Sequence, residues 1–187
     1  MTHLKPAADT YLRHIPGFVA TDQADTMLHL LQACIPWSSF APSPNSRKVC
    51  RWQLGMSDAD SIIHDLQHKL ERTENVTVQG TFLNLYQDGK DYCPYHRDLY
   101  GTDVYTISLG ATRDLLVKPD GSGDTRKITL KSGDLYYMDE KLHKNHKQQH
   151  TKTRRSFQTT DQHSILRIID CINGLEYVLV PKVPRVA

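Results

Sequence analysis

The sequence predicts a mainly β fold of the α+β class, a double-stranded β-helix, or jelly roll, with N-terminal helices packed outside it. Three observations favour this fold. Two amphipathic segments lie before about residue 75, short β-branched and aromatic runs follow from about residue 76, and 187 residues suffice for one compact core but hardly for two. We therefore expect a single domain over residues 1–187, with a helical part at about 1–75 and a β-helix core at about 76–180.

The composition is that of an ordinary globular protein, with 39% apolar and 24% charged residues. No apolar run reaches the length that spans a bilayer, and the N-terminus lacks the basic, apolar and small-residue succession of a signal peptide. The 4 cysteines lie apart without CxxC spacing. We therefore expect free thiols in a reducing compartment, cytoplasmic or nuclear rather than secreted, with no membrane association and no obligate protein partner.

Two segments have the apolar spacing of amphipathic helices. Residues 21–35 carry apolar side chains at intervals of three and four behind Thr21, which can serve as the N-cap. Residues 57–70 repeat the pattern behind Ser57, which can cap a second helix. Each predicted helix has one apolar face to bury.

Seven short runs after residue 76 predict the strands of an antiparallel sandwich or barrel. They are VTVQGTFLNLY (76–86), VYTISLG (104–110), DLLVKP (114–119), KITLK (127–131), DLYYM (134–138), SILRIIDCI (164–172) and EYVLV (176–180). The Gly and Asp residues of PDGSGD (119–124) tolerate positive φ, which predicts a hairpin turn there.

His96 and Asp98 stand two residues apart in YCPYHRDLYG. Alternate residues of an extended segment point to the same side, so both can reach one ion while Arg97 points away. A non-haem iron oxygenase needs two imidazoles and one carboxylate on one face of the metal, with open positions for its co-substrates. His96 and Asp98 are therefore two candidate iron ligands, or two polar residues of a turn.

Arg167 lies within the strongly apolar run SILRIIDCI, where an unpaired guanidinium would be costly. It therefore requires an anion. A bound carboxylate would satisfy the planar guanidinium, and so would an acidic side chain such as Asp170 or Glu176.

Cations gather in two places. Residues 141–155 contain six Lys or Arg residues, three His and no acidic side chain, which suits either phosphate contacts or a solvated loop. The stretch NSRKVCRW (45–52) adds three cations, including Arg47. Trp52 and Tyr100 are candidates for stacking on a flipped or single-stranded base, although Trp52 suits a core position equally well.

The stretch FLNLYQDGKDYCPYHRD, followed by VYTISLGATRDLLVK, resembles the core of the AlkB-type Fe(II)- and 2-oxoglutarate-dependent dioxygenases. The family pattern runs N-x-Y, x-D-G, a short spacer, H-x-D, then S-L-G and Arg. The likeness extends to HIPGFVATDQADTMLHLLQACIPW, to SRKVCRWQLG on the substrate side, and to the Gly-Asp turn in KSGDLYYM. It covers about residues 13–172 and implies that the helical part includes a substrate lid.

The resemblance implies that Fe(II) is held by His96, Asp98 and a distal histidine that follows the Gly-Asp turn at Gly133. We assign the distal ligand to His146. His150 is the alternative, four residues further along and on the same face of a strand.

The resemblance also implies how the co-substrate 2-oxoglutarate is bound. Asn84 and Tyr86, two residues apart, match the hydrogen-bonding pair of the family. The arginine that holds the distal carboxylate lies in a final core strand in the family, which points to Arg167, with Arg155 as the alternative for a shorter spacing.

The implied reaction consumes 2-oxoglutarate and O2 and releases succinate and CO2, while a methyl group on a base nitrogen is hydroxylated and leaves as formaldehyde. We therefore expect an oxidoreductase that demethylates an alkylated, N-methylated nucleobase in DNA or RNA, as in DNA repair. Leu99 and Tyr100 depart from the acidic residue that many base-reading members carry after the iron aspartate. The alternatives are the same chemistry on protein side chains or a small metabolite, and a catalytically inactive β-barrel binding module.

Overall fold

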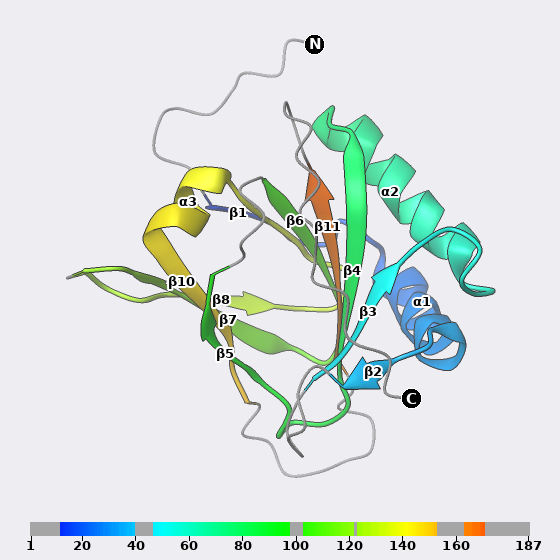
Figure 1. Ribbon diagram of the computed structural model, residues 1–187, viewed down its shortest axis with the longest axis horizontal. Helices are drawn as coiled ribbons and strands as arrows, with labels where there is room; N and C mark the ends of the chain where they lie inside the picture. Colours follow the sequence, from blue (N-terminus) through cyan, green and yellow to red (C-terminus); the bar gives the residue numbers. More distant parts are fainter. Residues whose placement is uncertain (1–11, 40–46, 98–102, 122, 153–162, 171–187) are drawn as a thin grey trace, which may run out of the picture.

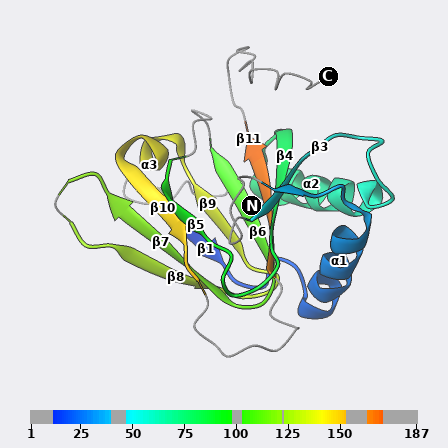
Figure 2. The ribbon, with the colours of Figure 1, turned by 60° about the horizontal axis from the view of Figure 1, so that its bottom comes forward.

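The computed structural model describes residues 12–39, 47–97, 103–121, 123–152 and 163–170, with the backbone alone described at residues 51–52 and 163–170. Two antiparallel sheets, of 7 and 4 strands, face each other (Figure 1). This arrangement is consistent with the predicted jelly roll. Two helices cover the outer side of the larger sheet (Figure 2).

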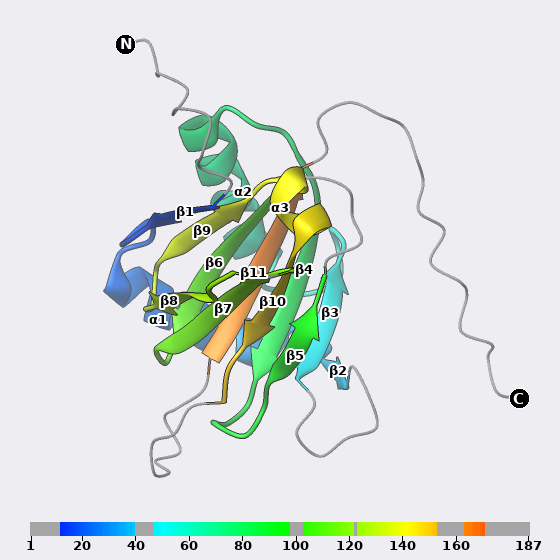
Figure 3. The ribbon, with the colours of Figure 1, turned by 90° about the vertical axis from the view of Figure 1, so that its left-hand side faces the viewer.

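Strands far apart in the chain become neighbours because the chain alternates between the two sheets. The larger sheet has the order β1 (Leu12–Ile15), β9 (Leu135–Met138), β6 (Val104–Gly110), β11 (His163–Asp170), β4 (Val78–Tyr86), β3 (Lys48–Trp52) and β2 (Ser38–Ser39). The smaller sheet has the order β5 (Cys93–His96), β10 (His146–His150), β7 (Arg113–Pro119) and β8 (Arg126–Leu130). Figure 3 shows the smaller sheet in front of the larger one.

The run predicted at 104–110 coincides with β6, and the runs assigned to β4, β7, β8, β9 and the start of β11 agree within a few residues. The run at 176–180 lies outside the described residues. Strands β1, β2 and β3 were not predicted, because the first third of the chain was interpreted as helical. The loop between β7 and β8 lies where the turn was predicted, although position 122 is outside the described residues.

Helix α1 (Thr21–Cys34) and helix α2 (Asp60–Glu74) lie where the apolar spacing places them, but both predicted N-caps are wrong. Thr21 is already the first helical residue, and the extended Ala20 precedes it without a side-chain cap. Ser57 instead accepts a hydrogen bond from the backbone N–H of Ala59 at 3.2 Å, which forms a turn ahead of α2.

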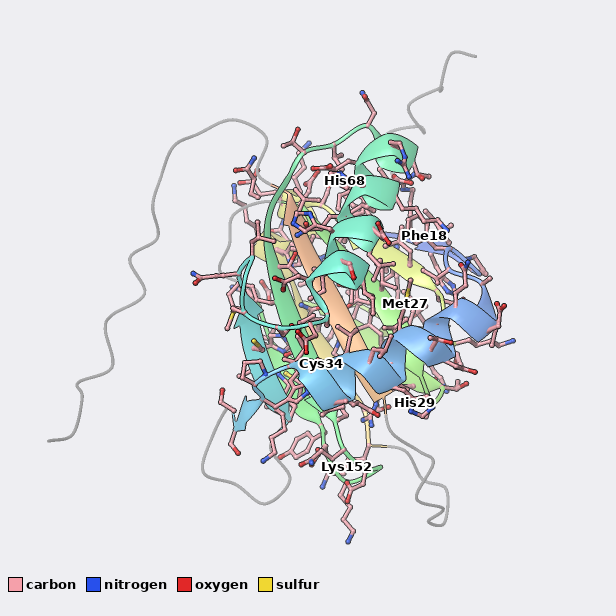
Figure 4. All side chains as sticks on the ribbon, turned by 90° about the vertical axis from the view of Figure 1, so that its right-hand side faces the viewer. Phe18, Met27, His29, Cys34, His68 and Lys152 are labelled. Atoms are coloured by element: carbon pink, nitrogen blue, oxygen red, sulfur yellow. The ribbon has the colours of Figure 1, made fainter. Side chains whose placement is uncertain are left out.

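The hydrophobic core lies mainly between these helices and the larger sheet. Its buried side chains include Ala24, Leu28 and Leu31 of α1, Ile63, Leu66 and Leu70 of α2, and Leu83, Tyr105, Ile107, Leu109 and Leu135 of the sheet. Figure 4 views this layer from outside, with Met27, His29 and Cys34 along α1 and His68 on α2. No helix of the described residues is long and apolar enough to cross a membrane.

Between the two sheets lies a smaller apolar cluster. It consists of Leu115, Val117, Leu130, Tyr136, Met138 and, from the short helix α3 (Glu140–Asn145), Leu142. Helix α3 joins β9 to β10 and starts at Asp139, whose carboxylate accepts a hydrogen bond from the backbone N–H of Leu142 at 2.7 Å. We call the end of the barrel where α3 lies the α3 end.

The Gly-Asp turn before β9 fastens the N-terminal segment to the barrel. The Asp134 carboxylate accepts hydrogen bonds from the backbone N–H of Gly17 at 3.0 Å, from that of Lys131 at 2.9 Å and from Nε2 of His14 at 2.8 Å. Burial raises the pKa of this carboxyl, but the three hydrogen bonds outweigh it, so its pKa lies below the ordinary value.

We expect Asp134→Asn to lower the free energy of unfolding by about 1–3 kcal/mol at neutral pH, because the amide cannot replace a charged acceptor of three donors. A carboxyl whose pKa is lowered in the folded state stabilises the protein above its unfolded pKa of about 3.9 and loses this effect as pH falls through the folded value. Urea unfolding should therefore show the difference between wild type and variant shrinking below about pH 4. An equal difference at pH 7 and pH 3 would contradict this role of Asp134.

Candidate active site

His96 and the start of β10 lie close together although the sequence separates them widely. Strands β5 and β10 are neighbours, with Gln148 opposite His96 and His150 opposite Cys93 (Figure 3). His96 ends β5 and His146 begins β10, and both termini lie at the α3 end because α3 leads directly into β10. The fold thus brings two of the predicted iron ligands to the same end of adjacent strands.

The imidazole of His96 has an orientation that suits metal binding. Its Nδ1 lies 2.9 Å from the carbonyl oxygen of Pro94, which can only accept, so Nδ1 carries the proton in this contact. In the neutral imidazole Nε2 then lacks a proton, as metal binding through this nitrogen requires. The thiol sulfur of Cys93 lies 3.3 Å from Nδ1 of the same ring.

Arg97 points away from this site, as the alternation of side chains predicts. It is exposed and forms an ion pair with Asp120, which follows β7. The hydrogen bond from Arg97 lowers the pKa of the Asp120 carboxyl. The ion pair ties the segment that contains His96 to the adjoining end of the smaller sheet, while Asp98 lies outside the described residues.

His146 presents a buried nitrogen to the space between the strands. Its Nδ1 is inaccessible to solvent and makes no hydrogen bond to any residue in the described part of the chain. A buried polar nitrogen is normally satisfied by a partner, so this imidazole suits a ligand that the described residues do not supply. Together with the His96 orientation, the donor set fits a divalent metal of the kind that imidazole and carboxylate ligands hold.

His150 lies at the other end of β10, deep in the barrel. It is fully buried, and its ring lies 5.8 Å from that of Tyr86 and 6.3 Å from that of Tyr136. The Tyr136 hydroxyl lies 3.4 Å from Nε2 of His150. His150 is therefore part of a tightly packed aromatic group.

Asn84 and Tyr86 both lie on the face of β4 that looks between the sheets, and both are buried. Oδ1 of Asn84 accepts a hydrogen bond from Nε of Arg47 at 2.7 Å, and Nη1 of Arg47 lies 2.9 Å from the sulfur of Cys93. Arg47 therefore links β4 to β5. Sequence reasoning missed this contact because it depends on the approach of three separate segments.

Arg113 at the start of β7 is a second functional candidate that sequence reasoning missed. Only 1% of it is exposed, and its guanidinium lies 4.5 Å from the ring centre of Tyr86. It donates hydrogen bonds to the carbonyl oxygens of Asp91 at 2.8 Å, Thr151 at 2.6 Å and Asp88 at 3.3 Å. Burial lowers the pKa of Arg113. These contacts fix the loop that leads from β4 into β5. The one sequence signal for Arg113 was the Arg that follows S-L-G in the family pattern.

The side chains of the two candidate arginines for 2-oxoglutarate lie outside the described part of the chain. Arg167 is in β11, opposite Phe82 of β4 and Thr106 of β6, with its backbone alone described. Arg155 lies outside the described residues, as do Leu99 and Tyr100. Trp52, in β3, is likewise described by its backbone alone.

The larger sheet has one apolar and one polar face. On β6, Tyr105, Ile107 and Leu109 belong to the core under the helices, so Thr106 and Ser108 face the smaller sheet. Both are 0% exposed. Asn84 from β4, and Gln148 and His150 from β10, are also buried between the sheets. Because buried polar groups are costly without partners, a polar barrel interior suits a polar ligand.

The described part of the basic run at 141–155 covers α3, β10 and the two residues that follow β10. Lys144 pairs with Glu140 within α3. Lys152 follows the far end of β10, where its ammonium lies 4.6 Å from the ring centre of Tyr92 (Figure 4). Of the described cations of the run, Lys141 and Lys144 lie in α3, Lys147 lies in β10 and Lys152 follows β10.

No group of three His, Cys, Asp or Glu side chains able to hold a metal occurs within the described ranges, which exclude Asp98. His96 and His146 therefore provide at most two ligands of the predicted set there.

Known proteins share this fold. A prolyl-4-hydroxylase from Pseudomonas putida aligns with a TM-score of 0.59 and 10% identity, over 87% of this chain and 93% of that one. An oxidoreductase of the 2OG-Fe(II) oxygenase family from Burkholderia pseudomallei aligns with a TM-score of 0.63 and 14% identity, over 87% and 85%. OsALKBH1 aligns with a TM-score of 0.63 and 13% identity, over 90% and 100%. The fold is that of the 2OG-Fe(II) oxygenases.

Sequence comparison adds less. No family model matches the chain. The uncharacterized protein R406 of Acanthamoeba polyphaga mimivirus is 28% identical over 89 residues, which are 46% of this chain and 47% of that protein. The match therefore spans about half the length of that relative.

Proposed function

We propose that this chain is an Fe(II)- and 2-oxoglutarate-dependent dioxygenase in which His96, Asp98 and His146 hold the iron. The observation that carries the proposal is the placement of His96 and His146 at the α3 end of two neighbouring strands. It is supported by the fold shared with 2OG-Fe(II) oxygenases and by the buried Nδ1 of His146.

The pairing register favours His146 over His150 as the distal ligand. Gln148 is opposite His96, and the same antiparallel register continued by two residues would pair position 98 with position 146. His150 is opposite Cys93, on the side of His96 away from Asp98. One metal bound to positions 96 and 98 is therefore nearer to position 146.

We propose that Asn84, Tyr86 and an arginine bind 2-oxoglutarate between the sheets. Asn84 and Tyr86 line the buried polar interior. Arg167 is favoured over Arg155, because it lies opposite Thr106, and residues directly opposite in a sheet share a face. A guanidinium on that face could hold the distal carboxylate bidentately.

When bound, the iron and 2-oxoglutarate supply the oxidising power that breaks a substrate C–H bond. His96, Asp98 and His146 would hold the iron and leave positions for its co-substrates. The apolar side chains of Val117, Met138 and Leu142 between the sheets limit the access of water to the interior.

We propose an N-methylated nucleobase in DNA or RNA as the substrate. The AlkB-like motifs support this proposal, and one structure with the same fold, OsALKBH1, is an AlkB homologue. The alternative is hydroxylation of a protein side chain, which the likeness to a prolyl-4-hydroxylase favours. Both reactions use the same iron site, so the substrate decides between them.

The test is product formation by the protein with Fe(II), 2-oxoglutarate and O2. We expect succinate and formaldehyde in equal amounts with N-methylated single-stranded DNA or RNA, and nucleic-acid binding that weakens steeply with salt. Succinate that is stimulated by a proline-containing peptide, without formaldehyde, would favour the alternative. The absence of succinate above background under all these conditions would overturn the enzyme proposal.

A further inference from the structure

Thr106 in β6 has a fully buried hydroxyl for which the described residues supply no hydrogen-bond partner. The residue is 0% exposed, and its Oγ1 makes no hydrogen bond to any side chain or backbone group of the described residues. A buried hydroxyl without a partner loses its hydrogen bonds to water and gains none in return, at a cost to folding. Such a group in a folded protein calls for an explanation, and a bound ligand is one.

The direction of the hydroxyl is set by the strand. Tyr105 and Ile107, the neighbours of Thr106, belong to the core beneath α1 and α2, so Thr106 points to the opposite side, between the two sheets. Directly opposite it on β9 is Tyr136, which belongs to the cluster between the sheets. On its other side, β11 places position 167 directly opposite.

The position of Thr106 along the barrel suits a contact with the distal carboxylate of a metal-bound keto acid. Val104 begins β6 and pairs with Met138, the last residue of β9 before α3, so Thr106 lies toward the α3 end, two residues in from it. His96 and His146 also lie at this end, on the smaller sheet that faces it. A five-carbon diacid chelating a metal there would extend inward, toward the wall that contains Thr106.

We infer that the Thr106 hydroxyl donates a hydrogen bond to the distal carboxylate of 2-oxoglutarate. This inference rests on the proposed function and adds to it a residue that the motifs did not indicate. In the sheet Thr106 lies between Tyr136 and position 167, so its hydroxyl would be near a carboxylate that the proposed arginine at position 167 binds. Binding of the diacid would satisfy this hydroxyl, which has no partner among the described residues of the ligand-free protein.

The test uses Thr106→Val, which keeps the shape of the side chain and removes only the hydroxyl. For the metal-free protein we expect the urea midpoint to stay the same or rise, since a hydroxyl without a partner contributes nothing to the folded state. For the protein with Mn(II), a redox-inert substitute for Fe(II), calorimetry should show a Kd for 2-oxoglutarate raised roughly tenfold to a hundredfold. Thr106→Ser should restore most of this affinity.

Thr81→Val is the matched control on the opposite face of the same sheet. Thr81 is 1% exposed, and its hydroxyl accepts a hydrogen bond from Nε2 of Gln67 on α2 at 2.8 Å. This variant should lower the urea midpoint and leave the Kd for 2-oxoglutarate unchanged. The two Thr→Val variants therefore predict opposite combinations of stability and affinity.

A second probe, 2-oxobutyrate, keeps the keto-acid end and lacks the distal carboxylate. Wild type and Thr106→Val should bind it equally, because the lost contact is to the missing group. If wild type binds 2-oxoglutarate and Thr106→Val binds it as tightly, or if Thr106→Val lowers the urea midpoint as Thr81→Val does, the assignment of Thr106 is overturned. If wild type binds neither keto acid, the proposed function fails and the inference fails with it.

Discussion

His146→Ala should abolish turnover of 2-oxoglutarate, with a loss of at least about a hundredfold, while the protein remains folded. The expected cause is the loss of one of three metal ligands, since His146 begins β10 at the α3 end, beside the strand that His96 ends. Its imidazole is only partly buried, so the change should cost little stability. Succinate formation and Fe(II) affinity are the measurements.

Two further variants separate this role from a general effect on the fold. His150→Ala should lower the free energy of unfolding by roughly 2–4 kcal/mol, because it empties a fully buried position between Tyr86 and Tyr136, yet leave Fe(II) bound. His29→Ala, on the exposed face of α1, should change neither property. Iron binding that survives in His146→Ala and disappears in His150→Ala would reverse the assignment of the distal ligand.

Gly133→Ala should cost the protein roughly 3 kcal/mol or more of its free energy of unfolding. Gly133 has φ 86°, in the left-handed region, and a Cβ there would lie 2.0 Å from the carbonyl oxygen of Val19. The backbone N–H of Val19 donates to the carbonyl oxygen of Gly133 at 2.9 Å, so the two segments cannot separate without losing this hydrogen bond. Urea unfolding measures the loss.

Substitutions at two other glycines distinguish the cost of a positive φ from the cost of a steric clash. Gly55 has φ 85° but nothing within 4 Å of the position that a Cβ would take, so Gly55→Ala should cost only about 1 kcal/mol, the penalty for the left-handed conformation. Gly80, in β4, has neither a positive φ nor a close neighbour, and Gly80→Ala should be neutral or stabilising. Equal losses for Gly133→Ala and Gly55→Ala would show that the approach of Val19 contributes nothing.

The β strands were predictable where the segment itself is rich in β-branched and aromatic residues. The run at 104–110 is β-branched and aromatic, and its bounds match β6. Strand β3 was missed because the first third of the chain was interpreted as helical, and because the pairing of KVCRW with β4 depends on tertiary contact. The N-cap predictions were wrong by one and two positions. Thr21 and Ser57 have suitable side chains, but the N-cap positions of α1 and α2 are Ala20 and Ala59.

The candidate site was predictable only in its local parts. His96 and Asp98 are recognisable from their spacing, and Asn84 and Tyr86 from theirs, because alternate residues share a face of a strand. Arg47 gave no such signal, since its contacts with Asn84 and Cys93 join three segments that only the fold brings together.

The sequence also did not show how the basic run is distributed over the elements of the fold. Its residues are contiguous in the sequence, but its described part is divided between α3, β10 and the two residues that follow β10. His146 and His150 belong to the same run and have different surroundings, one at the α3 end and one packed against Tyr86 and Tyr136. Separation along a strand is a tertiary property that charge counting does not reveal.

The central claim is that the chain holds Fe(II) and 2-oxoglutarate together in the barrel, through His96, Asp98 and His146. Its most direct test is an anaerobic titration of the wild-type protein with Fe(II) and then 2-oxoglutarate, followed by visible absorption. A metal-to-ligand charge-transfer band should appear only when both are present and saturate at one equivalent of each. A folded protein that develops no such band at saturating concentrations of both would contradict the account.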